Sequence, residues 1–192
     1  MELNERIDKI AWQLFAERGY AQVKMDDIAR ELGMSKKTLY NTIPSKEALI
    51  HRLVEAFIAK IEIATAEIAT NPELSCYEKL RGLPAYLLSQ VSLIQPILFN
   101  DIRRFLPDTW TLMETTRHRI INERVGAIIR EGIERGEVRH DLDAELVQDV
   151  LFNSLQGVIT SALPLTDPVR FVQLIDATML LLYEGLAKRD SQ

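Results

Sequence analysis

The stretch that decides the fold is Gly33-Met34-Ser35-Lys36-Lys37-Thr38-Leu39-Tyr40-Asn41-Thr42-Ile43-Pro44-Ser45-Lys46-Glu47. Gly33 is suited to end one helix, and Ser35 is a good N-cap for a short helix that reaches about Ile43. Pro44 ends that helix, because its ring cannot continue the backbone hydrogen bonding. Ser45 can then cap a long helix that begins at Lys46. Such closely spaced helix ends predict a helix-turn-helix.

Two further helices are predicted upstream of this stretch. Apolar residues recur at helical spacing over residues 7–15, and Gly19 follows as a helix terminator. A second segment, residues 25–32, carries Asp26 and Asp27 in its first turn, where acids complement the helix dipole. An ordinary helical bundle with short connections has the same spacing, so spacing alone leaves that alternative open.

Helical spacing also runs through the rest of the chain. We expect helices over about 46–70, 75–93, 97–106, 107–135, 143–163 and 168–188. Glycine and proline number only 8 and 7, which favours helices over sheets. We therefore predict an all-α protein in which residues 1–46 form a helix-turn-helix domain and residues 47–192 form a larger helical domain.

Composition is typical of a soluble globular protein. Of the 192 residues, 47% are apolar and 27% are charged. Cys76 is the single cysteine, so we expect no intrachain disulfide and no multi-cysteine metal site. The charged start of the chain lacks an apolar signal core, and no stretch is apolar enough to suggest a membrane span. We therefore expect a cytoplasmic protein with no membrane partner.

Charge is unevenly distributed along the chain. The net charge is −5, but residues 1–55 are neutral, with nine basic and nine acidic side chains. Between Ser35 and Arg52, four basic residues face a single acid, Glu47. A DNA-binding face needs local positive charge, because phosphate neutralisation and counterion release favour binding. The negative total therefore does not exclude nucleic acid.

Several blocks of sequence between Ile7 and Leu49 carry a family likeness. They are Leu14-Phe15-Ala16-Glu17-Arg18-Gly19-Tyr20, Met25-x-x-Ile28-Ala29, Gly33-Met34-Ser35-Lys36-Lys37-Thr38-Leu39-Tyr40 and Pro44-Ser45-Lys46-Glu47-Ala48-Leu49. In this order the chain resembles the tetracycline-repressor-like (TetR/AcrR) family. The resemblance implies nine or so helices, a two-fold homodimer, DNA binding by the second and third helices, and repression relieved by a ligand. Residues 1–46 would then be the DNA-binding domain, and residues 47–192 the effector-binding and dimerisation domain.

The sequence departs from the family pattern at two places. The family commonly has Thr or Ser just before the second helix, and Val23-Lys24 stands there in this chain. This puts one phosphate contact in doubt, although Lys24 can supply a charge instead. The family usually has Phe near the end of the third helix, and here Ile43 stands in its place.

The third helix should carry the DNA-binding side chains. In a helix-turn-helix the second helix of the motif enters the major groove and presents its N-terminal residues to the bases. Leu39 and Ile43 lie four residues apart and should face the core. By the family's pattern, Tyr40 and Lys46 hold phosphates. The full predicted set is Lys24, Ser35, Lys36, Lys37, Thr38, Tyr40, Asn41 and Lys46. The alternative for Lys36 and Lys37 is an ordinary solvated charge.

The middle helices offer residues for a small-molecule effector. Aromatic walls with a few polar groups are typical of such pockets. The predicted ligand-binding residues are Tyr86, Gln90, Phe99, Asn100, Arg103, Trp110, Met113 and Arg117. An ordinary amphipathic helix pair has the same composition, so that alternative stays open. We expect no cofactor and no metal: Glu114 and His118 fit a surface ion pair, and Cys76 fits a buried inert thiol.

The last two helices are apolar on more than one side, which predicts two buried faces. One face would pack on the chain itself and the other on a second copy, as a four-helix dimer interface. The predicted interface residues are Leu151, Leu155, Val158, Ile159, Phe171, Ile175, Met179 and Leu182. A deep core within one chain is the alternative.

The function predicted from these patterns is that of a DNA-binding transcriptional regulator. We expect a repressor that a small-molecule effector releases from a palindromic double-stranded operator. An activator or a co-repressor-dependent regulator of the same fold is an alternative, and a helical scaffold without DNA binding is another. No phosphate-binding loop, serine elbow or zinc-protease motif is found, so we do not expect an enzyme.

Overall fold

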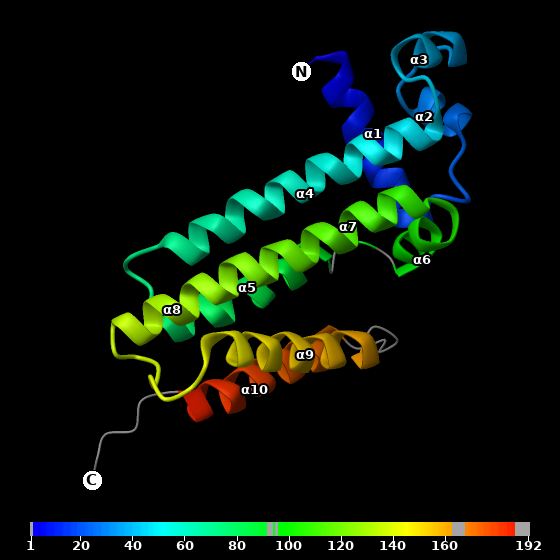
Figure 1. The fold of residues 1–192 in the computed structure, drawn as a ribbon. Helices are drawn as coiled ribbons and strands as arrows, with labels where there is room; N and C mark the ends of the chain where they lie inside the picture. Colours follow the sequence, from blue (N-terminus) through cyan, green and yellow to red (C-terminus); the bar gives the residue numbers. More distant parts are fainter. Residues whose placement is uncertain (1, 92–93, 95, 163–167, 187–192) are drawn as a thin grey trace. The chain divides into compact units, whose positions relative to one another are not determined.

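The computed structural model describes residues 2–91, 94, 96–162 and 168–186. Its helices are α1 (Leu3–Arg18), α2 (Met25–Glu31), α3 (Lys36–Thr42), α4 (Lys46–Thr70), α5 (Cys76–Val91), α6 (Pro96–Phe105), α7 (Pro107–Ile120), a π-helical turn (Ile121–Val125), α8 (Gly126–Glu134), α9 (Ala144–Ala162) and α10 (Pro168–Leu186). The α7 helix, the π turn and α8 follow one another without a break (Figure 1). Within the described ranges the prediction of an all-α fold with about nine helices is confirmed.

Four side-chain N-caps fix where their helices begin. In each case a side-chain oxygen accepts a backbone N–H from the first turn, at 3.0–3.3 Å. The four capping residues are Ser35, Ser45, Ser75 and Asp143. Because a cap satisfies a backbone donor that the helix itself cannot, these residues set the starts of α3, α4, α5 and α9.

The chain divides into two compact units, which we describe separately. The N-terminal unit comprises Met1–Lys60 and Ser92–Thr116, and the C-terminal unit comprises Ile61–Val91 and Arg117–Gln192. The predicted domain division after residue 46 concerns function and stays a prediction. None of the helices in the described ranges combines the length and apolar character that a bilayer span requires.

The core of the N-terminal unit is built from α1, α2, α3, the start of α4 and α6. Phe15, Ile28, Leu39 and Leu49 are completely buried in it. The α6 helix adds Leu98 and Ile102, both almost fully buried, and it packs against α1. The helix-turn-helix therefore rests on a core that includes residues far from it in sequence.

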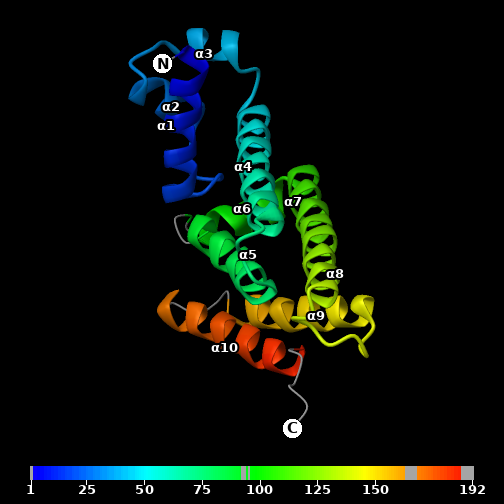
Figure 2. The same cartoon turned by 90° about the vertical axis from the view of Figure 1, so that its left-hand side faces the viewer.

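The core of the C-terminal unit lies where α10 packs against α5 and α9, and where α8 packs against the same two helices (Figure 2). Leu151, Ile175 and Met179 are buried in it, so these three predicted interface residues pack within the chain itself. Leu155, Val158 and Leu182 are partly buried against the same core. The side chains of Ile159 and Phe171 lie outside the described residues.

A buried lysine in the C-terminal unit is paired with a partly exposed glutamate. The Lys79 side chain is 1% exposed, and its Nζ donates to both carboxylate oxygens of Glu131 at 2.6 and 2.7 Å. The Lys79 ammonium lowers the pKa of Glu131, and Arg135 adds to this effect. A buried ammonium is tolerated only with such a partner, so the pair joins α5 to α8.

We predict that Glu131→Gln lowers the free energy of unfolding by about 2 kcal/mol at neutral pH, because it leaves the buried Lys79 without an anionic partner. The loss is smaller than for a fully buried pair, since Glu131 is 37% exposed and solvent screens it. Urea unfolding measures the change. Asp176→Asn, which breaks the exposed pair with Arg81, is the control and should cost less.

The same pair predicts a dependence on pH. Because the pKa of Glu131 lies below the ordinary 4.5 in the folded chain, its contribution is fully present above 4.5. It is lost as the pH falls through the lowered value. The stability difference between the wild type and Glu131→Gln should therefore shrink in acid. A difference that stays constant down to acid unfolding would contradict the role of the pair.

Candidate nucleic-acid interface

The α3 helix turns one side to the core and the other to solvent. Leu39 is 0% exposed and Ile43, which follows the helix, is 2% exposed. The predicted DNA-binding residues that are exposed on and beside α3 are Ser35, Lys36, Lys37, Thr38, Tyr40 and Asn41. The sequence predicts this arrangement, in which the apolar side of the helix faces the core and the polar side is free to enter a DNA groove.

Four of the predicted DNA-binding residues line one shallow depression between the start of α2 and α3. They are Lys24, Lys36, Tyr40 and Lys46, and the other lining residues are Val23, Met25 and Asp26. Figure 1 shows α2 and α3 next to each other in the N-terminal unit. The depression therefore gathers basic and hydrogen-bonding groups from three helices and the residue before α2.

An ion pair crosses this depression. The Asp26 Oδ1 lies 2.8 Å from the Lys36 Nζ, and both side chains are 58% exposed. The hydrogen bond that Lys36 donates to Asp26 raises the pKa of Lys36, and the Lys36 Nζ also lies 5.9 Å from the centre of the Tyr40 ring. Sequence reasoning gave Asp26 only a role in the helix dipole, since nothing in the sequence pairs it with Lys36.

Lys46 is engaged within the chain. Its Nζ donates to the backbone carbonyls of Tyr20 and Val23 at 2.8 and 2.9 Å, and it lies 4.0 Å from the centre of the Tyr20 ring. Burial lowers the pKa of Lys46, while Asp101 acts in the opposite direction. Lys46 thus ties the loop between α1 and α2 to the start of α4. An ammonium has three donors, so one remains for the predicted phosphate contact.

The same loop is also held by α6. The Asp101 Oδ2 accepts the backbone N–H of Ala21 at 2.7 Å. Gly19 has a φ of +79°, and a Cβ placed on it would lie 2.7 Å from that carboxylate oxygen. Glycine is therefore required here both by the left-handed backbone and by the close approach of α6.

The departure from the family pattern before α2 has a local explanation. Asp27 Oδ2 accepts the backbone N–H of Lys24 at 2.9 Å, which lowers the pKa of Asp27. Val23 is 1% exposed and packs in the core. The start of α2 is thus closed by Asp27 from within the helix, and the exposed Lys24 side chain lines the depression.

The predicted ligand-binding residues are divided between the two units. Phe99, Trp110 and Met113 pack against the N-terminal core. Asn100 and Arg103 of the same unit are exposed. The others, Tyr86, Gln90 and Arg117, belong to the C-terminal unit, where Arg117 donates to Gln156.

Cys76 is buried, and burial raises the pKa of its thiol to about 12, as expected of an inert thiol. Among the described residues, no three His, Cys, Asp or Glu side chains are grouped so that they could hold a metal ion.

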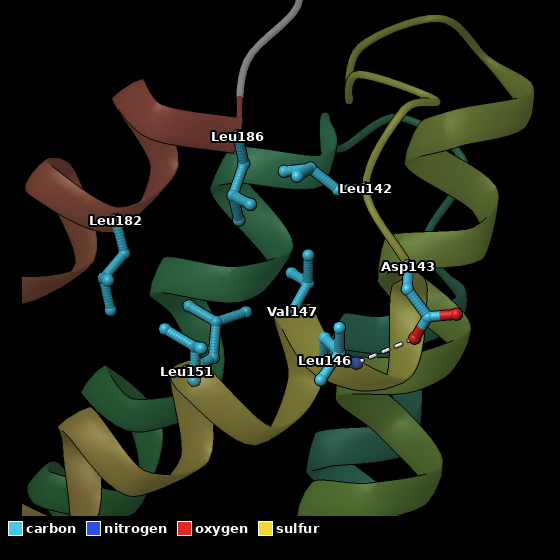
Figure 3. Close-up of a pocket in the computed structure, with 8 residues that line it drawn as sticks. Leu142, Asp143, Leu146, Val147, Leu151, Leu182 and Leu186 are labelled. Carbon is cyan, nitrogen blue, oxygen red and sulfur yellow. Dashed lines mark hydrogen bonds between the residues drawn. The ribbon is translucent and has the colours of Figure 1, made fainter.

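A second concave surface lies in the C-terminal unit, between the start of α9 and the end of α10. It is an apolar groove lined by Leu142, Asp143, Leu146, Val147, Val150, Leu151, Leu182 and Leu186. Figure 3 shows the leucine and valine side chains of α9 and α10 turned toward this groove, and Asp143 capping α9. None of the predicted ligand-binding residues lines it.

Comparison with known proteins gives a consistent result. Residues 9–53 match the family described as "Bacterial regulatory proteins, tetR family". The HTH-type transcriptional regulator YvaF of Bacillus subtilis is 25% identical over 96% of this chain and 95% of its own length. The HTH-type transcriptional repressor DhaR of Mycobacterium sp. is 28% identical over 77% of this chain and 75% of its own length. The structure of a transcriptional regulator from Saccharomonospora viridis in complex with choline has a TM-score of 0.75 at 23% identity. The match covers 97% of this chain and 98% of that one.

We predict that Lys46→Met lowers the free energy of unfolding by about 2 kcal/mol, because two loop carbonyls lose a charged donor. Urea unfolding followed by circular dichroism measures this. Lys37→Met removes an exposed lysine from α3 and should change stability by no more than about 0.5 kcal/mol. Equal stabilities for the two variants would show that Lys46 does not hold the loop.

Proposed function

Because this chain is a transcriptional regulator of the tetR family, we propose that it works as a homodimer that represses transcription from a palindromic operator in the cytoplasm. A small-molecule effector releases it from the DNA. The observation that carries the proposal is the outward face of α3, whose exposed residues are polar or basic while Leu39 is completely buried. The repressor function of the similar DhaR supports repression over activation.

Two kinds of side chain would act at the operator. Lys36, Lys37 and Thr38 lie in the N-terminal half of α3, where a recognition helix meets base edges, and Asn41 lies further along the same helix. Lys24, Ser35, Tyr40 and Lys46 would bind phosphates and so fix the orientation of α3 in the groove. Phosphate contacts set affinity and salt dependence, and base contacts set sequence preference.

The exposed apolar residues of the last two helices support the dimer. Leu146 and Val150, four residues apart on α9, are 66% and 53% exposed, and both line the apolar groove. Leu180 and Leu181 on α10 are 45% and 72% exposed. Large aliphatic side chains gathered on two packed helices are typical of a surface covered by a partner. We propose that a second copy of this chain covers them.

Effector control requires two states of the dimer. The effector must bind the state that does not fit the operator more tightly than the state that does, since otherwise it shifts no equilibrium. The candidate residues are the aromatic and polar side chains of the middle helices named above. The choline bound to the S. viridis regulator shows that a protein of this fold can take a small organic ligand.

DNA binding is tested by selecting duplexes from a randomised library with the purified chain and measuring Kd over a range of salt. We predict that Lys46→Ala weakens binding to all sequences alike and reduces the slope of log K against log salt by about 0.9, the effect of one lost phosphate contact. Lys60→Ala removes an exposed charge further along α4 and is the control. An unchanged slope in Lys46→Ala would leave this residue only its role in the loop.

The dimer is tested by Leu146→Glu, measured by light scattering after size-exclusion chromatography. A carboxylate in the first turn of α9 suits the helix dipole, so the fold should be kept while the apolar surface gains a charge. We predict a monomer with weakened operator binding. Ile63→Glu alters an equally exposed residue of α4, at 62%, and should stay a dimer. A dimer in both variants would contradict the proposed interface.

A further inference from the structure

The depression between α2 and α3 contains one feature that phosphate binding does not use. Asp26 is an acid on a surface that faces DNA in the proposed function, where it would repel phosphates. It nevertheless lies 2.8 Å from Lys36, the first residue of α3, and is as exposed as that lysine. A carboxylate on this surface weakens the attraction to phosphates. It can favour binding only if the DNA itself offers it a hydrogen-bond donor.

We propose that Asp26 and Lys36 act together as a reader of one G·C base pair in each half of the operator. In this role Asp26 determines specificity from α2, because it supplies the hydrogen-bond acceptor that Lys36 of α3 lacks. The proposal rests on the proposed function, because it requires that α3 enter the major groove.

The chemistry of the base edges supports this pairing. In the major groove guanine presents two acceptors, N7 and O6, and the paired cytosine presents the N4 amino donor beside them. Lysine is a usual partner of guanine, and aspartate is a usual acceptor for cytosine N4. An ammonium and a carboxylate 2.8 Å apart therefore offer a donor and an acceptor side by side, as one G·C pair requires.

The atoms that such contacts need are available in the structure. Lys36 Nζ spends one of its three donors on Asp26 Oδ1, so two remain for guanine. Asp26 Oδ2 can accept from cytosine N4. In an A·T pair the two acceptors, adenine N7 and thymine O4, are separated by the adenine N6 amino donor, so the ammonium meets only one acceptor, which is the poorer match.

The pair also orders the groups before DNA arrives. Lys36 is a long side chain that would otherwise be free to rotate, and Asp26 holds its Nζ at the edge of the depression. Because Asp26 is fixed in the first turn of α2, the position of the ammonium is tied to the fold. Asp27, next to it, closes the start of α2 and so keeps that turn in place.

The test uses the full chain and a library of randomised duplexes. The wild type should enrich a palindrome with one invariant G·C pair in each half-site. The Lys36→Ala variant should show a weaker preference for G·C at that position. Kd is then measured for that operator and for one with A·T at this position. We expect the A·T operator to bind the wild type about tenfold more weakly, and Asp26→Ala to lose most of this discrimination.

Glu31→Ala is the matched control, since it also removes an exposed acid from α2 and should keep the tenfold discrimination. If Asp26→Ala binds both operators more tightly by the same factor, the Asp26 carboxylate only repels the DNA phosphates and the inference is wrong. A selected palindrome with no invariant G·C pair would also overturn the inference while leaving the proposed function intact. If the wild type enriches no duplex, the proposed function itself fails.

Discussion

Burial of two side chains fixes how this protein can meet DNA. The α3 helix has only seven residues, which is too short to be stable alone, so it depends on packing. Leu39 and Ile43 supply that packing in a core shared with Ile28 of α2 and Leu49 of α4. Once both residues face inward, the periodicity of a helix leaves the polar residues of α3 outward. The orientation of the proposed DNA-binding face therefore follows from the core beneath it.

Charged residues around that core also have structural roles. Lys46 from α4 and Asp101 from α6 hold the loop between α1 and α2 from two sides, through the carbonyls of Tyr20 and Val23 and the N–H of Ala21. This loop leads into α2 and so sets where α2 begins. The basic residues of the depression are consequently restrained by the fold, and Lys36 is restrained by Asp26.

Much of the fold could be predicted from the sequence, because helix ends depend on local chemistry. Ser35 and Ser45 cap their helices where the sequence placed them. The contacts of Lys46 and Asp26 could not be predicted, since both join segments brought together only by the fold. The apolar pattern of the last two helices also could not say which residues face inward. Leu151 is buried within the chain, whereas Leu146, five residues earlier, is 66% exposed.

The most direct test of the central claim is a hydroxyl-radical footprint of the purified chain on its selected duplex, combined with the mass of the complex. The account predicts two chains per duplex and two protected stretches of backbone, centred about 34 Å apart, which flank the major-groove segments entered by the two α3 helices. A protein that remains a single chain and protects no duplex even in dilute buffer, where phosphate contacts are strongest, would contradict it.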